Sequence, residues 1–450
     1  MKRTFSIHGK VRKAMKNRYG ALLLTPVLLV AACLAQTGED GNAAPLMRVT
    51  VAPPSETPIW VRTSPNAKCT LHPDGLDDEK HSLKLYADAE GMVRFLTRSA
   101  AESDVHAKLV LLCQSGETTT IHPIELRSAY APTSDMPAPV VPTTEVGIPR
   151  PALSGDPMAP SNDELQMMGY PPRPDPQKAP KAYANWLRMI SKPATFVPPQ
   201  MVASNSFAGP TTQLDYSNWN GFELRTCSAY RCPLTNDTSP YWWITGQWYV
   251  PSVTGEYNAA TYSALWIGLD GDLTLGLNNL IQAGTEQDAF NIFGFTVSVY
   301  QVWTEWWPAQ SQQFISNFPV NPRDEILTYV WLSHYSTTDL FVAYIFDLTT
   351  SHYTAVNTLV PTGKILGDTA EWIMERPYQQ QPNGAIVYPD LADYGIAGMS
   401  NTEAVRVNGN YVTYNGSVNA QIEMFNNNDE LSAVYPVDAT DMLFVWLAFH

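Results

Sequence analysis

Residues 295–307 read FTVSVYQVWTEWW, and this stretch decides the fold class. Most of its residues are β-branched or aromatic, and apolar residues alternate with polar ones, which is the period of a half-buried strand. The same alternation occurs in GQWYVPSV (246–253), DEILTYVWLSH (324–334) and LFVAYIFDL (340–348). Turn sequences such as DGD (270–272) separate these runs. The pattern predicts an all-β domain over residues 217–450, with two antiparallel sheets packed face to face.

The charge of the chain is strongly negative. Its 450 residues carry a formal net charge of −15 with a pI near 4.9. Nucleic acid is therefore excluded as a partner, because there is no basic surface to bind phosphates. Residues 217–450 hold six Lys and Arg against 23 Asp and Glu, so this domain gains little positive charge in acid and is suited to it. Many exported proteins are acidic without acting in acid, and the composition does not distinguish this alternative from adaptation to acid.

The N-terminus has the pattern of an export signal. A basic region is followed by the apolar run ALLLTPVLLVAACLA (21–35), which is too short and too interrupted by Pro26 for a membrane span. We therefore expect residues 1–35 to be the signal peptide of a bacterial protein that is secreted or held in the cell envelope. LVAAC, ending at Cys33, resembles a lipobox, whose cysteine carries a lipid that anchors the protein to the membrane. The alternative is cleavage after Ala35, which would discard Cys33.

Four cysteines remain when Cys33 is set aside. When each cysteine is paired with the next one along the sequence, the pairs are Cys69 with Cys113 and Cys227 with Cys232. This predicts two disulfides formed in an oxidising compartment. A zinc site at Cys227 and Cys232 is disfavoured, because no second Cys or His pair lies nearby in the sequence. We expect neither a metal nor a cofactor.

The N-terminal half begins with short alternating runs. Residues 47–128 contain segments such as SLKLYAD (82–88) and AKLVLLC (107–113), separated by turn residues. This spacing, together with the disulfide, predicts a small Ig-like β-sandwich in front of the larger domain. No catalytic motif stands out in it, so we interpret it as an accessory domain.

Two connecting segments follow. Residues 131–161 are rich in Pro and lack periodicity, which predicts an extended linker. Residues 162–201 include PKAYANWLRMI (180–190), whose apolar side chains recur at helical spacing. We expect a short helix there that packs on the next domain through Trp186 and Leu187. The segment is either a helical connector or part of a propeptide, and the sequence does not decide.

Five short motifs in residues 217–450 carry a resemblance to a known family. In order, they are SNWNG (217–221), LWIGLDGD (265–272), NLIQAG (279–284), VWTEWWP (302–308) and AEWIMERP (370–377). Together they resemble the glutamic peptidases, or eqolisins, over about residues 217–404. The resemblance implies a bent two-sheet sandwich of the lectin-like jelly-roll kind and an acid-acting endopeptidase that cleaves polypeptides.

The resemblance also implies roles for single residues. It puts the catalytic glutamine at Gln282 and the catalytic glutamate at Glu375. The positions that surround the family's active site fall on Trp219, Trp266, Asp270, Glu305 and Trp307. Two residues depart from the family pattern, because Trp307 stands where the type enzyme has a tyrosine and Ala283 where the usual motif has a threonine. The family's long-range disulfide is absent.

The chemistry of these residue types agrees with a peptidase. Hydrolysis without a metal needs a base for water, a donor for the oxyanion and an acid for the leaving amine. Glu375 can take the proton and return it, and the amide of Gln282 can donate to the oxyanion. In a strand over AEWIMERP, Glu371 points to the same side as Glu375 and is expected to support the groove.

Two other functions stay open at this point. A sandwich that had lost activity would bind glycans or peptides through its Trp-rich face. A glycosidase would use two carboxylates about 5 to 10 Å apart, such as Glu305 and Glu375.

Overall fold

The computed structural model describes twelve ranges of the chain. They are residues 44–51, 56–76, 78–99, 105–128, 147–204, 206–207, 218–226, 237–334, 337–380, 386–414, 419–426 and 429–450. The expected signal peptide with Cys33, residues 131–146 of the linker and the predicted bridge between Cys227 and Cys232 lie outside them. Among the described helices, none is long and apolar enough to cross a membrane.

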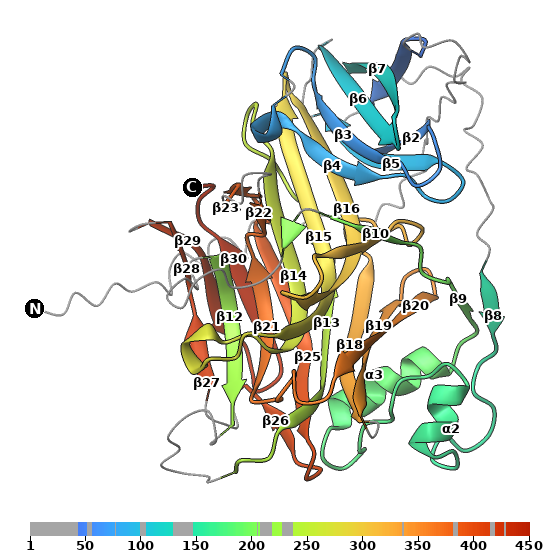
Figure 1. Ribbon diagram of the computed structural model, residues 1–450, viewed down its shortest axis with the longest axis vertical. Coiled ribbons are helices and arrows are strands. Elements are labelled where there is room, and N and C mark those ends of the chain that lie inside the picture. The colour runs from blue at the N-terminus through green and yellow to red at the C-terminus, as the bar shows by residue number, and fades with distance from the viewer. Residues whose placement is uncertain are drawn as a thin grey trace, which may run out of the picture. The chain divides into compact units, whose positions relative to one another are not determined.

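The first large sheet collects all five motifs (Figure 1). Its antiparallel strands follow the order β10 (Met201–Ala203), β17 (Gln313–Ile315), β16 (Phe295–Trp307), β15 (Leu280–Ile292), β14 (Thr261–Asp270), β21 (Thr369–Glu375), β12 (Trp219–Arg225) and β27 (Asn419–Ile422). The short strand β24 (Asp390–Leu391) runs parallel to β14. The alternation at 295–307 therefore forms one strand, β16, as predicted.

The second large sheet covers the first. Its order is β28 (Met424–Asn426), β29 (Asp429–Pro436), β30 (Met442–Trp446), β25 (Ile396–Arg406), β13 (Tyr241–Tyr249), β18 (Glu325–His334), β19 (Thr338–Asp347), β20 (His352–Pro361), β9 (Ala194–Phe196) and β8 (Ile148–Arg150). The strand β26 (Tyr411–Thr413) pairs with β25. All these pairs are antiparallel except that of β9 with β20. The predicted two-sheet sandwich is confirmed.

The main core lies between these two sheets. Leu265, Ile267 and Trp372 of the first sheet pack there with side chains of the second, such as Trp248 and Val330. The indole of Trp372 also crosses the interface and donates to the carbonyl oxygen of Thr245 at 2.8 Å. Full burial of each such side chain stabilises the fold by about 1.5–3 kcal/mol.

The small N-terminal sandwich is present, but it is joined to the first sheet. One layer has the order β1 (Met47–Val51), β7 (Thr118–Ser128), β6 (His106–Ser115), β3 (Lys68–Pro73) and β4 (Leu83–Tyr86). The other layer is the pair β2 (Thr57–Arg62) and β5 (Met92–Ser99). Residues 96–99 of β5 continue into the first sheet by pairing with residues 295–298 of β16. Phe290 and Phe295 of that sheet lie in the core of the small sandwich.

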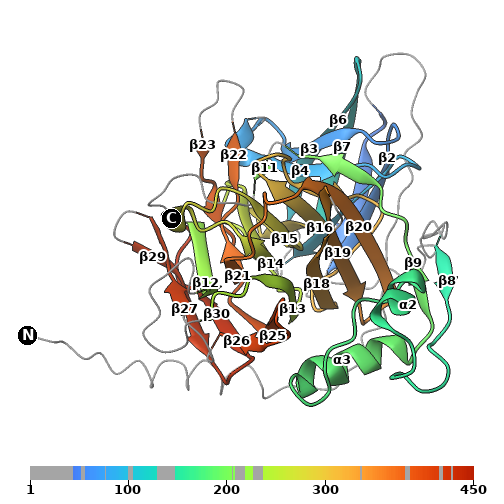
Figure 2. The same cartoon turned by 60° about the horizontal axis from the view of Figure 1, so that its bottom comes forward.

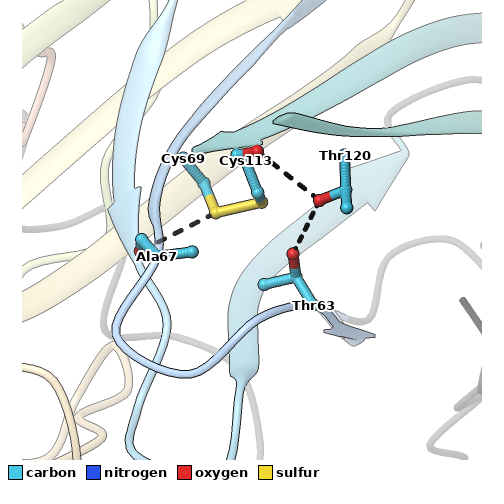
Figure 3. Close-up of a disulfide and its surroundings, with 5 residues drawn as sticks. All are labelled: Thr63, Ala67, Cys69, Cys113 and Thr120. Atoms are coloured by element: carbon cyan, nitrogen blue, oxygen red, sulfur yellow. Dashed lines mark hydrogen bonds between the residues drawn. A yellow bond between two sulfur atoms is a disulfide. The ribbon is translucent and has the colours of Figure 1, made fainter. Parts of the chain in front are cut away.

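The disulfide between Cys69 and Cys113 is confirmed (Figure 3). The two cysteines lie opposite each other on the neighbouring strands β3 and β6. Beside them the hydroxyls of Thr63 and Thr120 are 2.9 Å apart. The bridge joins two residues that are 44 positions apart in the sequence, within the small sandwich.

Two helices of the connecting segment lie against the second sheet (Figure 2). They are α2 (Asn162–Met167), which starts with a capping box of Ser161 and Glu164, and α3 (Pro180–Ile190). The predicted helix is thus confirmed as α3. Trp186 is fully buried against the sheet, and Leu187 packs at the edge of the same cluster.

A buried arginine attaches the described part of the Pro-rich linker to the same sheet. Arg150 of β8 lies 4.2 Å from the ring centroids of both Tyr170 and Tyr353 and donates to the hydroxyl of Tyr344 at 2.6 Å. Cation–π contacts of this kind strengthen when they are shielded from water. The chain is therefore held along the second sheet before the first of the five motifs begins.

Candidate active site

The five motifs meet on one face of the first sheet. Along β21, Ile373 belongs to an aromatic cluster on that face, whereas Trp372 and Met374 point into the main core. The predicted alternation of AEWIMERP is therefore confirmed. The aromatic cluster also contains Trp219, Trp266, Trp303 and Trp307.

Glu375 is buried and accepts a hydrogen bond at each carboxylate oxygen. The side-chain amide of Asn218 donates to Oε1 at 2.8 Å, and the indole of Trp266 donates to Oε2 at 2.7 Å. Trp219 packs edge-on against Trp266, with ring centroids 5.0 Å apart. Two neutral donors thus hold the carboxylate in a fixed orientation, since charge-assisted bonds of this length are strong.

Gln282 and Glu305 are a directly opposed cross-strand pair on β15 and β16. The amide nitrogen of Gln282 donates to Oε2 of Glu305 at 2.8 Å. Both side chains are fully buried. Glu305 therefore orients the Gln282 side chain.

Glu371 lies in the same cross-strand row of the sheet as Gln282. In register, Glu223 lies opposite Glu371, Glu371 opposite Gly268, and Gly268 opposite Gln282. Glu371 and Gln282 therefore flank a position without a side chain. Glu375 lies four residues further along the same strand.

Glu371 belongs to a buried acidic cluster that sequence reasoning did not foresee. Burial raises the pKa of Glu371 well above its usual value, and the neighbouring Glu223 raises it further. Burial, and then Asp272, raise the pKa of Glu223 to about 8. Arg225 bonds to Glu223 and lies 2.9 Å from Asp272. Alternation along β12 turns residues 219, 221 and 223 to one side, but it does not show which strand lies opposite Glu223.

Asp270, one of the positions expected to surround the active site, holds the turn that leads into β21. Its carboxylate accepts backbone N–H groups of Leu366, Gly367, Asp368 and Thr369. Burial raises its pKa to about 6, although these four donors act in the opposite direction. Because the turn leads into β21, Asp270 sets where that strand begins.

Trp307 contacts a tyrosine that sequence reasoning did not single out. Its indole donates to the hydroxyl of Tyr378 at 3.0 Å. Burial raises the pKa of Tyr378, and the charges of Glu305 and Glu375 raise it further. This phenol is therefore neutral, and it comes from β22 (Tyr378–Gln380), which pairs with β11 (Ser206–Phe207).

A second buried acidic pair lies further along β15. Burial raises the pKa of Glu286 to about 7, and Asp288, two residues on, has a pKa raised by burial and then by Glu286. The side-chain amide of Gln312 donates to Glu286 at 2.5 Å. Sequence reasoning missed these residues, although they alternate with Gln282 on one side of the strand.

Two side chains from outside residues 217–450 complete the aromatic cluster. They are Tyr86 of β4 and Val202 of β10. Tyr86 stacks on Phe314 with ring centroids 5.1 Å apart. With Gln282, Glu305 and Glu375 all fully buried, the structure is closed over the site.

Comparison with known proteins gives one family and several solved structures. Residues 217–442 match the model of the peptidase A4 family. A crystal structure of scytalido-glutamic peptidase with a peptide-based transition-state analogue is similar at 20% identity, covering 52% of this chain and 99% of that one, with a TM-score of 0.40. SCP-B, an eqolisin solved with the tripeptide Ala-Ile-His, is similar at 18% identity over the same shares, with a TM-score of 0.39. No curated protein sequence matches the chain.

Proposed function

This chain belongs to the peptidase A4 family and is a glutamic endopeptidase, and from this premise we propose that it cleaves polypeptides in acid with Gln282 and Glu375 as its catalytic pair. The hydrogen bonds to Glu375 carry the proposal. Both of its oxygens accept from fixed neutral donors, an arrangement that suits a carboxylate acting as a general base.

The proposed reaction uses water as the nucleophile. Glu375 takes a proton from a water molecule as the water oxygen bonds to the peptide carbonyl carbon. The carbonyl oxygen becomes an oxyanion, to which the amide N–H of Gln282 donates. As the C–N bond breaks, Glu375 returns its proton to the leaving nitrogen. The products are a carboxylic acid and an amine.

The neighbouring residues position this pair. Trp266 and Asn218 orient the base, and Glu305 orients the amide of Gln282. Such preorganisation accounts for a large part of catalysis, because donors already in place need not reorganise during the reaction. The hydroxyl of Tyr378 accepts from Trp307, and the charges of Glu305 and Glu375 raise its pKa, so it is neutral in acid.

The decisive test compares three variants with an acidic residue outside the site. We expect Glu375→Gln to abolish acid proteolysis while leaving the fold intact. Gln282→Ala should lower kcat by about 100- to 1,000-fold, as is typical when an oxyanion donor is lost. Glu371→Gln is the discriminating variant because Glu371 shares a row with Gln282, and it should reduce activity less than either.

Glu423→Gln, at an exposed site, is the matched control and should behave as wild type. Hydrolysis of a denatured protein substrate in acid is the measurement. Near-normal proteolysis by Glu375→Gln would refute the assignment of the base. Metal chelators and serine-reactive reagents should have no effect, because the proposed steps use neither a metal nor a hydroxyl nucleophile.

We also propose that the protein is exported and that Cys33 becomes its lipid-bearing first residue. The basic and apolar pattern of residues 1–35 supports this. Mass spectrometry of the mature N-terminus should find a chain that starts at a diacylated Cys33. A mature chain that begins after Ala35 would favour secretion without an anchor, and one that retains residues 1–35 would contradict export.

A further inference from the structure

Three side chains that can bind a metal meet beside the start of β14. They are Glu256 in the loop between β13 and β14, Asp390 of β24, and His450, which follows β30. One carboxylate oxygen from each acid and one ring nitrogen of the histidine all lie within 4.8 Å of one another. Within the described ranges of the chain, no other three Asp, Glu, His or Cys side chains come together in this way.

The distances to the histidine fit a single bound ion. Nδ1 of His450 lies 3.9 Å from Oε1 of Glu256 and 3.9 Å from Oδ1 of Asp390. Two ligands bonded to tetrahedral zinc at about 2.0–2.2 Å are about 3.3–3.6 Å apart. All three side chains are partly exposed, so they can close the remaining difference of a few tenths of an ångström around an ion.

The charge of the group favours a cation. The side chains of Glu256 and Asp390 contact each other, which is unfavourable for two ionised carboxylates. Among the described residues, no Lys or Arg forms an ion pair with either carboxylate. Lys80 and Arg376 act on them from a longer distance. A cation held between the two oxygens would replace their repulsion by attraction.

Backbone hydrogen bonds hold the three segments together without the ion. The N–H of Leu391 donates to the carbonyl oxygen of Phe449 at 2.8 Å, which places β24 beside the residue that precedes His450. The N–H of Asn291 donates to the carbonyl oxygen of Glu256 at 3.0 Å. The ligands are therefore brought together by the fold, and a preorganised site loses less entropy on binding.

We propose that Glu256, Asp390 and His450 bind a divalent transition-metal ion, with zinc as the expected ion. Zinc binds histidine nitrogen and carboxylate oxygen, and an open zinc site has three protein ligands with water as the fourth. Calcium and magnesium bind oxygen ligands, so the imidazole selects against them. The side chain of His450 is 61% exposed, and water can therefore reach the fourth position.

The ion stabilises the fold and takes no part in the proposed reaction. It links three segments that are far apart in sequence, one of which is anchored in the main core through Leu391. An ion that binds the folded chain and not the unfolded one raises stability by mass action. Neither Gln282 nor Glu375 belongs to the group, so the inference does not depend on the proposed function.

This site corrects the expectation from the sequence that the protein binds no metal. That expectation rested on the spacing of cysteines and histidines in local motifs. The three ligands here are separated by 134 and 60 positions, from 256 to 390 and from 390 to 450. No local pattern marks ligands that only the pairing of distant segments brings together.

The test measures zinc binding to the full chain after its metal has been removed with a chelator. Titration calorimetry with zinc chloride at about pH 7.5, where free imidazole is mostly neutral, gives the Kd. We expect Glu256→Gln, Asp390→Asn and His450→Ala each to raise this Kd at least about tenfold. Loss of a residue that only supports a metal ligand already costs about 10- to 100-fold in affinity.

His334→Ala is the matched control. The side chain of His334 is 59% exposed, close to the value for His450, but it lies beside the single carboxylate of Asp339, at 2.8 Å. This variant should keep the wild-type Kd for zinc. With Co²⁺ in place of zinc, the visible absorption that reports its coordination should be present in wild type and in His334→Ala and absent from His450→Ala.

Thermal melts give a readout that separates a bound ion from a surface effect. Zinc should raise the Tm of wild type and of His334→Ala, and it should leave that of His450→Ala unchanged. Acid proteolysis should be the same with and without a chelator, which tests the proposed function separately.

Four results would overturn the site. They are failure of the wild-type chain to bind zinc, the wild-type Kd in all three ligand variants, an equal loss of affinity in His334→Ala, which would mean adventitious binding to surface histidines only, and calcium binding that His450→Ala retains, which would mean an oxygen-only site. Weaker zinc binding in the three ligand variants, with the control unchanged, would establish it.

Discussion

At the scale of single residues, two glycines leave room for Trp266. A Cβ at Gly284 would lie 2.5 Å from the Cβ of Trp266 and 2.3 Å from the carbonyl oxygen of Leu265. A Cβ at Gly268 would lie 3.0 Å from the indole ring. Gly284 thus makes room for the backbone and Cβ of Trp266, and Gly268 for its ring, which donates to Glu375.

Gly284→Ala tests this close approach. The added methyl group has no space, so we expect a loss of about 1–3 kcal/mol in the free energy of unfolding, with a larger loss of activity as Trp266 shifts. Gly398→Ala is the matched control in β25, where the nearest atom would be 3.4 Å away, and its stability should be equal to or slightly above that of wild type. Urea denaturation followed by Trp fluorescence measures both. Equal stability of the two variants would contradict the packing argument.

Local sequence predicted part of the site and missed the rest for a physical reason. Glu375, Gln282 and Glu305 each lie in a motif that can be recognised within a few residues. The contact of Tyr86 with this site depends on which strands become neighbours, and alternation along one strand carries no information on its partners. The acidic cluster around Glu223 has the same cause, because its members come from different strands.

At the scale of elements, the hairpin of β15 and β16 connects the two parts of the molecule. Each strand has 13 residues, whereas the neighbouring β14 has ten. The end of β16 beside the hairpin turn, residues 295–298, thereby extends past β14 and pairs with β5. Alternation predicted these strands and the two-sheet sandwich. It did not predict that the small sandwich shares a core with the larger one, since that requires the pairing of strands about 200 residues apart in sequence.

Removal of the small sandwich tests this shared core. Phe290 and Phe295 are buried in it, so a chain that begins after residue 128 would expose both and lose the partner strand of β16. We expect that chain to aggregate or to melt at a lower temperature than the full chain. The same truncated chain with Phe290→Ser and Phe295→Ser should be more soluble. If the unmodified truncated chain is a soluble monomer with the melting temperature of the full chain, the sandwich is an independent domain.

At the scale of the whole molecule, the buried carboxylates determine how stability depends on pH. Burial is the main cause that raises the pKa of Asp270 to about 6, of Glu286 and Glu403 to about 7, and of Glu223 to about 8. In the unfolded chain such groups titrate near their ordinary value of about 4.5. Between these values the folded protein binds more protons than the unfolded one, so folding is favoured by acid. Exposed Asp438 acts in the opposite direction, because its bond to Lys181 lowers its pKa to about 2.

The direction in which stability changes with pH distinguishes a protein adapted to acid from one that merely has an excess of acidic residues. A raised pKa contributes stability that is fully present below about pH 4.5 and is lost as the pH rises through about 6 to 8, on the order of 1 kcal/mol for each tenfold gain in the proton affinity of a buried group. We expect thermal melts of the full chain to give a higher Tm near about pH 4 than near about pH 8. Glu286→Gln should flatten this dependence, because a neutral amide keeps the bond to Gln312 without titrating. The exposed carboxylates have few Lys and Arg to pair with, so their mutual repulsion in neutral solution also makes the protein less stable there than in acid.

A Tm that instead falls steeply between about pH 5 and pH 3, around the ordinary range of Asp and Glu, would mean that these buried groups are ionised and paired in the folded protein. The expectation of an enzyme that acts in acid would then lose its physical basis.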